Sequence, residues 1–219
     1  MKGKKYIAFF DIDDTILNIN STKILVQAAR KNGMMSTLSY IKAIYQVLLY
    51  RFKLKNALEI IHKMGGWVAG IHVDEFNIMV EGLNKTTIIR AIRPEIIEEI
   101  RKHKENNAEI AILSSAVEAI CFPLAEFLGI DHVLCSELES VGGRFTGNPV
   151  GRFCFGDEKL VRLKEFCSSG NHSVHDAFYY ADSIDDLPVL NYVGHPVCVT
   201  PDKKLIKFAT VRGWTIHQW

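Results

Sequence analysis

The sequence of 219 residues contains no hydrophobic run long enough to cross a membrane and no cysteine spacing typical of a zinc site. A membrane-spanning helix needs about 18 consecutive uncharged residues, and the apolar stretch near the start ends at Asp11, too early for a signal peptide. The five cysteines include no Cys-x-x-Cys pair and are odd in number, which disfavours a disulfide framework and a zinc ribbon. We therefore expect a protein without stable membrane insertion in a reducing compartment, the cytoplasm.

A strong net charge is also absent. The chain carries 26 Lys and Arg against 25 Asp and Glu, a formal charge of +1. A dedicated DNA-binding domain is usually clearly basic, so the balance predicts no nucleic-acid partner. The charge is unevenly distributed, because residues 18–90 carry ten basic and four acidic side chains.

Short, continuously apolar segments alternate with helical patterns along most of the chain. Such segments are typical of strands buried on both faces, as in a parallel sheet. They lie at residues 6–10, 109–113, 132–135, 177–181 and 196–199, with helical patterns at 94–105, 116–128 and 157–167 between them. The alternation predicts an α/β fold built on a Rossmann-like, doubly wound parallel sheet.

Residues 18–90 interrupt this rhythm, because they contain several helical patterns and no convincing strand. We predict an all-helical insertion there, with residues 1–17 and 91–219 forming the α/β core. An apolar stripe within the insertion, at Leu38, Ile41, Tyr45, Leu48 and Phe52, has helical spacing. It is interpreted as packing between the helices of the insertion, with peripheral contact to an anionic membrane as the alternative.

The Gly142-Gly143 pair predicts a β-hairpin over residues 138–150.

Polar residues gather where the predicted strands end. Ligands of open α/β sheets bind beyond the carboxyl ends of the strands. The residues expected at this edge are Asp11, Asp13 and Thr15 after the first strand, Ser114 and Ser115 after the second, Asp182, Asp185 and Asp186 after the fourth, and Lys159 behind Gly156.

This combination of side chains indicates phosphoryl chemistry. Neighbouring carboxylates are costly to bury without a counter-charge, and Mg²⁺ is commonly held by one or two carboxylates together with substrate phosphate. The lysine and the hydroxyl groups would complete the charge balance around a phosphoryl group.

At these positions the chain resembles the haloacid dehalogenase (HAD) superfamily of phosphatases. Phe10-Asp11-Ile12-Asp13-Asp14-Thr15 matches its DxDxT motif and Leu113-Ser114 its second motif. Gly156-Asp157-Glu158-Lys159 resembles the third, and Asp182-Ser183-Ile184-Asp185-Asp186 the fourth. The motifs occur in the order of the family, and the insertion lies where the family has a C1-type cap. The fourth motif followed by Leu187-Pro188, with Gly194-His195-Pro196-Val197 downstream, resembles subfamily IB, the phosphoserine-phosphatase-like branch.

The resemblance implies a Mg²⁺-dependent phosphatase that hydrolyses a small phosphate monoester through an aspartyl-phosphate. Asp11 would be the nucleophile, and Asp13 the general acid and base. The resemblance assigns substrate binding to Ser114, Ser115 and Lys159, and Mg²⁺ to Asp11, the carbonyl of Asp13, and Asp182, with Asp186 nearby.

Two positions depart from the phosphoserine phosphatase pattern. Asp185 replaces an asparagine, and it could repel substrate, bind metal or point away from the site. Asn20 replaces a glutamate of the cap, which argues against phosphoserine as the substrate.

Several alternatives stay open at this point. They are phosphoryl transfer to an alcohol acceptor, a lipid-head-group substrate, a receiver-type signalling domain and a phosphate-binding module without activity. Ser114 and Ser115 could simply cap the following helix, and Asp185 could be a surface charge. The physiological substrate and the oligomeric state are not specified by the sequence.

Overall fold

The computed structural model describes residues 6–42, 45 and 65–219, and its centre is a sheet of six parallel strands. The spatial order is β3-β2-β1-β6-β7-β8. The strands are β1 (Ile7–Phe10), β2 (Glu109–Val117), β3 (His132–Ser136), β6 (Phe178–Ala181), β7 (His195–Val199) and β8 (Thr215–His217). The predicted parallel α/β sheet is confirmed, but β8 was missed because Thr215–His217 is only three residues long and partly exposed.

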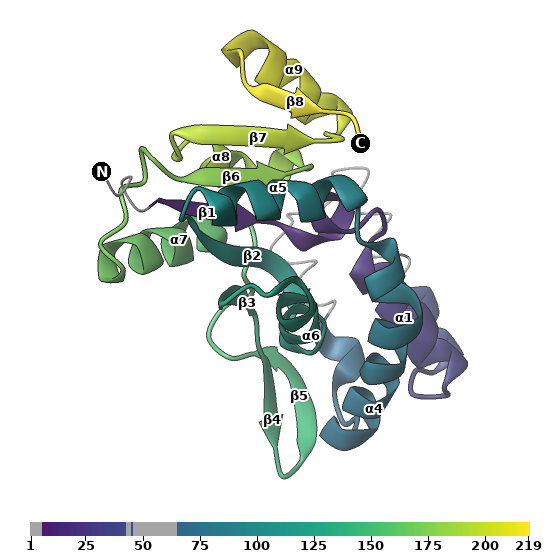
Figure 1. Ribbon diagram of the computed structural model, residues 1–219. Helices are drawn as coiled ribbons and strands as arrows, with labels where there is room; N and C mark the ends of the chain where they lie inside the picture. Colours follow the sequence, from purple (N-terminus) through teal and green to yellow (C-terminus); the bar gives the residue numbers. More distant parts are fainter. Residues whose placement is uncertain (1–5, 43–44, 46–64) are drawn as a thin grey trace.

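Side chains alternate between the two faces of the sheet, and each face is covered by helices (Figure 1). In β1, Ala8 and Phe10 pack in one apolar cluster with α5 (Pro94–Glu105) and α6 (Glu118–Leu128), whereas Ile7 and Phe9 pack in a second. That second cluster includes residues of α7 (Asp157–Ser169), α8 (Leu187–Leu190) and α9 (Lys203–Arg212). Burial on both faces explains why these strands are continuously apolar in sequence.

No strand is assigned to the described residues between β1 and β2. The chain leaves the sheet through the irregular turn Ile12–Ile16 and then forms α1 (Ser21–Lys31) and α4 (Val73–Leu83), with short helical turns at Gly66–Val68, Asn84–Ile88 and Ile89–Ala91. None of the described helices is long and apolar enough to cross a membrane.

The predicted hairpin is formed by β4 (Leu138–Val141) and β5 (Arg144–Pro149), which pair antiparallel. It packs against the helical segment, because Phe145 contacts Phe76 of α4 edge to face and the Phe145 N–H donates to the Ile71 carbonyl at 3.0 Å. The sequence did not indicate this contact.

The apolar stripe of the helical segment does not pack as expected where it is described. Leu38, Ile41 and Tyr45 are 63%, 57% and 58% exposed. Leu48 and Phe52 lie outside the described residues.

Candidate active site

The strand register brings the ends of β1 and β6 to the level of Ser114 within β2. Phe10 is opposite Ile112 of β2 and Tyr180 of β6, so that Asp11, Ser114 and Asp182 follow at the same edge of the sheet. The Asp11 N–H donates to the Tyr180 carbonyl at 3.0 Å, which extends the β1–β6 pairing up to the carboxylate. Asp11 is 6% exposed.

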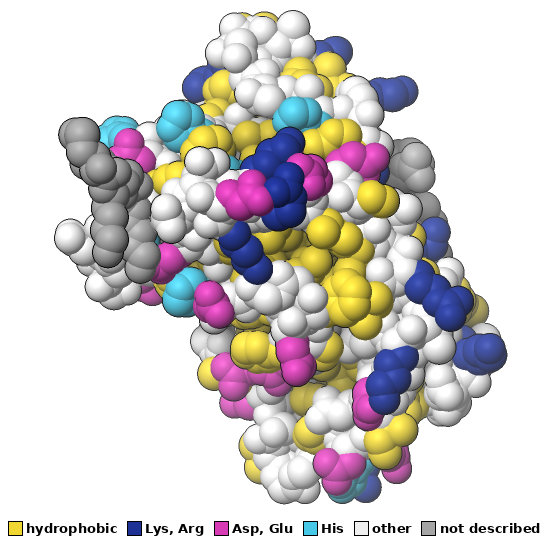
Figure 2. Space-filling view, viewed as in Figure 1, with side chains coloured by type: hydrophobic (Ala, Val, Ile, Leu, Met, Phe, Trp, Pro, Cys, Tyr) yellow, Lys and Arg dark blue, Asp and Glu magenta, His cyan; other side chains and the backbone are white. Residues whose placement is uncertain are grey.

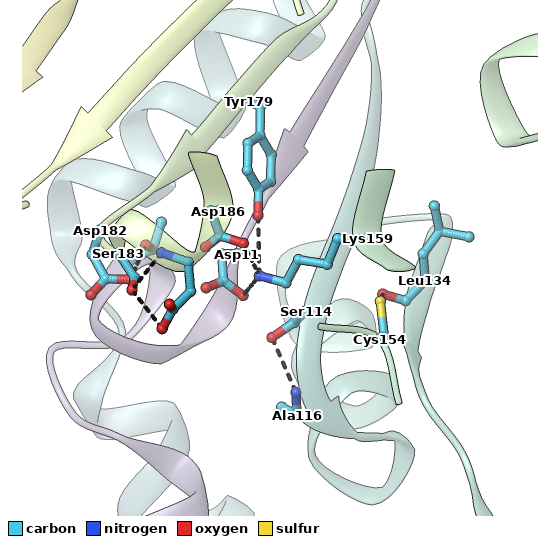
Figure 3. A network of polar contacts seen from close by, with 12 residues as sticks. Asp11, Ser114, Ala116, Leu134, Cys154, Lys159, Tyr179, Asp182, Ser183 and Asp186 are labelled. Carbon is cyan, nitrogen blue, oxygen red and sulfur yellow. Dashed lines mark hydrogen bonds and ion pairs between the residues drawn. The ribbon is translucent and has the colours of Figure 1, made fainter. Parts of the chain in front are cut away.

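A buried lysine lies among these acidic side chains (Figure 3). Lys159 Nζ is 3.1 Å from Asp11 Oδ1 and 2.7 Å from Asp186 Oδ1, and it donates to the Tyr179 hydroxyl at 3.1 Å. Burial alone lowers the pKa of Lys159, but Asp11 and Asp186 raise it well above its ordinary value, so the amine is charged. Helix α7, which carries Lys159, begins after Gly156, whose φ of +54° favours glycine.

Three carboxylates form a cluster that could hold a metal ion. One oxygen each from Asp11, Asp182 and Asp186 lies within 4.8 Å of the others. Burial, followed by the charges of Asp11 and Asp186, raises the pKa of Asp182 to about 8. Burial also raises the pKa of Asp186, although Lys159 opposes this. Lys159 is therefore insufficient to neutralise the cluster.

These residues fit a divalent cation. Asp11 Oδ1 is buried without a hydrogen-bond partner, although it is within ion-pair distance of Lys159. Oxygen ligands are those that Mg²⁺ prefers. A cation among the three carboxylates would offset the repulsion that, after burial, contributes to the raised pKa values of Asp182 and Asp186.

The carboxylate of Asp13 lies on the side of the turn that faces α1. Its Oδ1 accepts a hydrogen bond from the Ser21 N–H at 2.7 Å, and burial raises the pKa of Asp13 to about 6. A carboxyl group with a pKa near neutrality can both donate and accept a proton. Ser21 was not identified from the sequence, because this contact uses its backbone N–H.

Ser114 and Ser115 do not cap a helix. Both lie in β2, which continues to Val117, and α6 begins at Glu118 without a side-chain cap. The expected helix start at residue 116 is therefore two residues too early. Ser114 is fully buried and its Oγ accepts only a long bond, 3.3 Å, from the Ala116 N–H, whereas Ser115 is half-buried.

Asp185 belongs to a different environment from the metal-binding cluster. It is not a member of the group formed by Asp11, Asp182 and Asp186. Burial and the charge of Asp202 raise the pKa of Asp185, and Lys204 lowers it. Its Oδ2 accepts a hydrogen bond from the Ser183 hydroxyl at 3.5 Å, so the structure describes Asp185 in contact with Ser183 and outside the three-carboxylate group.

Asn20 caps a helix in the position where the related phosphoserine phosphatases are expected to have a glutamate. Its side-chain oxygen accepts from the Lys23 N–H at 2.9 Å, at the start of α1.

Tyr179 is a neighbour of the site that the sequence did not indicate, because its position in an apolar strand suggested only core packing. A buried tyrosine hydroxyl needs a polar partner, and this requirement was the available signal.

Residues 8–191 match the family model of the haloacid dehalogenase-like hydrolases, and the chain belongs to this family. The resemblance noted in the sequence is therefore confirmed.

Relatives and solved structures agree with this assignment. The chain is 27% identical to a probable phosphatase of Mycobacterium tuberculosis over 95% of this chain and 74% of the relative. It is also 27% identical to a histidinol-phosphatase of Neisseria meningitidis over 97% of this chain and 98% of the relative. A protein of unknown function from Bordetella pertussis Tohama I shares the fold with a TM-score of 0.88 and 22% identity, over 98% of each chain. A substrate-bound phosphoserine phosphatase shares it with a TM-score of 0.75 and 16% identity, over 99% of this chain and 94% of the other.

Proposed function

We propose that this protein is a Mg²⁺-dependent phosphatase that hydrolyses a small phosphate monoester through an aspartyl-phosphate on Asp11. The observation that carries the proposal is the convergence of Asp11, Asp182 and Asp186 on one point, with the charged Lys159 3.1 Å from Asp11. The family match and relatives named as phosphatases support the reaction class.

The first half-reaction transfers the phosphoryl group to the enzyme. An Asp11 carboxylate oxygen attacks phosphorus, and the bond from phosphorus to the ester oxygen breaks. Asp13 donates its proton to the departing alkoxide, in line with its pKa of about 6. Lys159 and the hydroxyls of Ser114 and Ser115 stabilise the phosphoryl oxygens.

The second half-reaction returns the enzyme to its starting state. Asp13, now ionised, accepts a proton from a water molecule that attacks phosphorus. The bond to Asp11 breaks and inorganic phosphate leaves. Mg²⁺, held by Asp11, Asp182 and the Asp13 carbonyl with Asp186 nearby, would neutralise negative charge on the phosphoryl group.

Residues 18–90 are proposed to form a cap over this site, with residues 1–17 and 91–219 as the core. Such a cap would exclude bulk water during the reaction and select the alcohol that leaves. A cytoplasmic location is part of the same proposal.

The direct test is release of phosphate from p-nitrophenyl phosphate and a panel of monoesters, with Mg²⁺ and with EDTA, alongside Asp11→Asn. We expect metal-dependent release by the unaltered protein and none by the variant. Hydrolysis in ¹⁸O-labelled water should place ¹⁸O in the released phosphate and leave the Asp11 carboxylate unlabelled, because water attacks phosphorus. Substantial activity in Asp11→Asn would refute the mechanism. Phosphate recovered on an added alcohol instead of water would identify a phosphotransferase.

A lipid-head-group phosphate is a second candidate substrate, favoured by the exposure of Leu38, Ile41 and Tyr45 on the basic segment. Apolar side chains among basic ones are typical of surfaces that bind anionic membranes. Co-sedimentation with phosphatidylserine vesicles at low salt tests this candidate, and absence of binding would remove it.

A further inference from the structure

The turn that carries Asp13 includes a residue in an unfavourable backbone conformation. Asp14 has φ +55° and ψ +3°, which is the left-handed region of backbone conformation. This region strains residues other than glycine, although aspartate and asparagine tolerate it better than most. The Asp14 N–H donates to the Ile19 carbonyl at 3.3 Å. Asp14 directly follows Asp13, whose Oδ1 accepts a hydrogen bond from the Ser21 N–H at 2.7 Å. Such a strained turn persists only when surrounding contacts hold it.

The side chain of Arg93 supplies one of these contacts. Its Nη2 donates to the Asp14 carbonyl at 3.3 Å, and its Nη1 donates to the main-chain oxygen of Trp219 at 2.7 Å. Among the described residues, no Asp or Glu side chain is within ion-pair distance of Arg93. The guanidinium binds main-chain oxygens in place of an acidic side chain.

Arg93 also lies where the chain returns from the helical segment to the sheet, next to the point where it leaves the sheet after β1. The backbone N–H of Arg93 donates to the Ile16 carbonyl at 2.9 Å, beside the β-bridge between Leu17 and Ile92. The Trp219 oxygen that it contacts also accepts from the Thr200 hydroxyl at 3.0 Å, after β7. One side chain thus connects the turn after β1, the return crossing before α5 and the segment after β8.

We propose that Arg93 is a positioning residue for Asp13. By holding the Asp14 carbonyl in place, it keeps the Asp13 carboxylate in the orientation needed to exchange protons with the leaving oxygen and with water. The inference rests on the proposed function, and it goes beyond it by assigning a role to a residue outside the family motifs. Arg93 acts through the Asp14 carbonyl and is not proposed to contact the substrate or the reacting atoms.

The first readout does not depend on activity. The Ser21 N–H lies in the first turn of α1, where the helix provides no acceptor, and Asp13 Oδ1 is its partner. In Arg93→Ala we expect hydrogen exchange of this amide, followed by ¹⁵N NMR, to become at least about tenfold faster. Amides of β6, in the centre of the sheet, report global opening and should keep their rates.

The second readout is kinetic. In Arg93→Ala we expect kcat to fall about 10- to 100-fold with KM nearly unchanged, because the phosphoryl-binding groups are intact. Millimolar guanidinium should restore part of kcat by occupying the vacated position. Arg93→Lys should be intermediate, since an ammonium cannot reproduce the planar fork.

Arg101→Ala is the matched control. Arg101 lies in α5, the helix that begins directly after Arg93, and forms exposed ion pairs with Glu98 and Glu105. Figure 2 shows acidic and basic side chains next to one another over α5. Arg101→Ala should leave both the Ser21 exchange rate and kcat unchanged.

Two outcomes would overturn the inference. One is an unaltered Ser21 exchange rate together with an unaltered kcat in Arg93→Ala. The other is a loss of kcat that accompanies global opening and that guanidinium does not restore. If the unaltered protein hydrolyses no ester, the proposed function falls, while Ser21 exchange still decides whether Arg93 orients Asp13.

Discussion

Lys159 is held 3.1 Å from Asp11 in a part of the site from which water is nearly excluded. The lysine arrives from α7 and the aspartate from the end of β1, so their contact depends on how the helix packs on the sheet. Because Asp186 is also in contact with the amine, one cation compensates two carboxylates. The negative charge of the site is therefore only partly neutralised when no metal ion is bound, which should make the stability of the metal-free protein sensitive to Lys159 and to pH.

Lys159→Met should abolish activity and destabilise the metal-free protein. Removing one partner of a buried ion pair leaves uncompensated charge and typically costs about 3–5 kcal/mol. Urea unfolding in EDTA at pH 7 measures the change, and Mg²⁺ should recover part of the lost stability. Lys164→Met, at an exposed position of the same helix, is the control and should change the free energy of unfolding by less than about 1 kcal/mol. Equal effects of the two substitutions would contradict the assigned role of Lys159.

The stability of the metal-free protein should decrease as the pH rises from about 4 to about 8. The pKa of Asp182 is raised to about 8 in the folded state, so the folded protein binds a proton that the unfolded chain releases near its ordinary value of 3.8. This contribution is complete below pH 4 and is lost as the pH passes through the folded-state pKa. Its size is on the order of a few kcal/mol.

Thermal unfolding in EDTA across this range checks the prediction. Asp182→Asn should flatten the profile, and saturating Mg²⁺ should reverse the trend, because the cation binds the ionised carboxylates. A metal-free protein that becomes more stable from pH 4 to 8 would show that the carboxylate cluster is ionised without a cation.

Ser114→Ala should lower kcat/KM about 10- to 100-fold with little change in stability. A hydrogen bond to a charged group contributes about 1.5–3 kcal/mol. Among the described residues, the hydroxyl of Ser114 makes one hydrogen bond, a long one of 3.3 Å with the Ala116 N–H. Steady-state kinetics on the best ester of the panel provide the measurement. Ser115→Ala, at the half-buried neighbour, tests whether both serines bind the phosphoryl group, and an unchanged kcat/KM there would restrict the role to Ser114.

Asp185→Asn should leave kcat/KM and the affinity for Mg²⁺ within about twofold of the unaltered protein. The charges that act on Asp185 are those of Asp202 and Lys204, which lie outside the carboxylate cluster. Isothermal titration with Mg²⁺ and steady-state kinetics measure both quantities, with Asp186→Asn as the comparison that should impair them. A large loss of Mg²⁺ affinity in Asp185→Asn would place Asp185 in the metal site.

The parallel sheet could be predicted because its signal is local. Strands buried on both faces must be apolar at every position, as Ile7 to Phe10 are, and their ends are marked by the polar residues that follow. The same pattern predicts that Asp11, Ser114 and Asp182 lie at one edge of the sheet, as they do in the structure. It failed for Thr215–His217, which is an edge strand with one neighbour and carries no such pattern.

Contacts between distant segments could not be predicted in the same way. The packing of the hairpin residue Phe145 on Phe76 depends on the relative placement of two segments, and no periodicity in either one encodes it. The exposure of Leu38, Ile41 and Tyr45 is a similar case, since a stripe of apolar residues does not specify which surface covers it.

The sequence by itself determined the class of fold, the family and the identity of the charged groups, because these follow from the hydrophobic period and from motifs within short stretches of chain. The tertiary structure decided which of those groups share one electrostatic environment. It placed Lys159 between Asp11 and Asp186, left Asp185 outside the group of three carboxylates, and brought Arg93 to the carbonyl of Asp14. The reason is that Coulomb energies and hydrogen bonds depend on distance and burial, which arise only when helices and strands have packed.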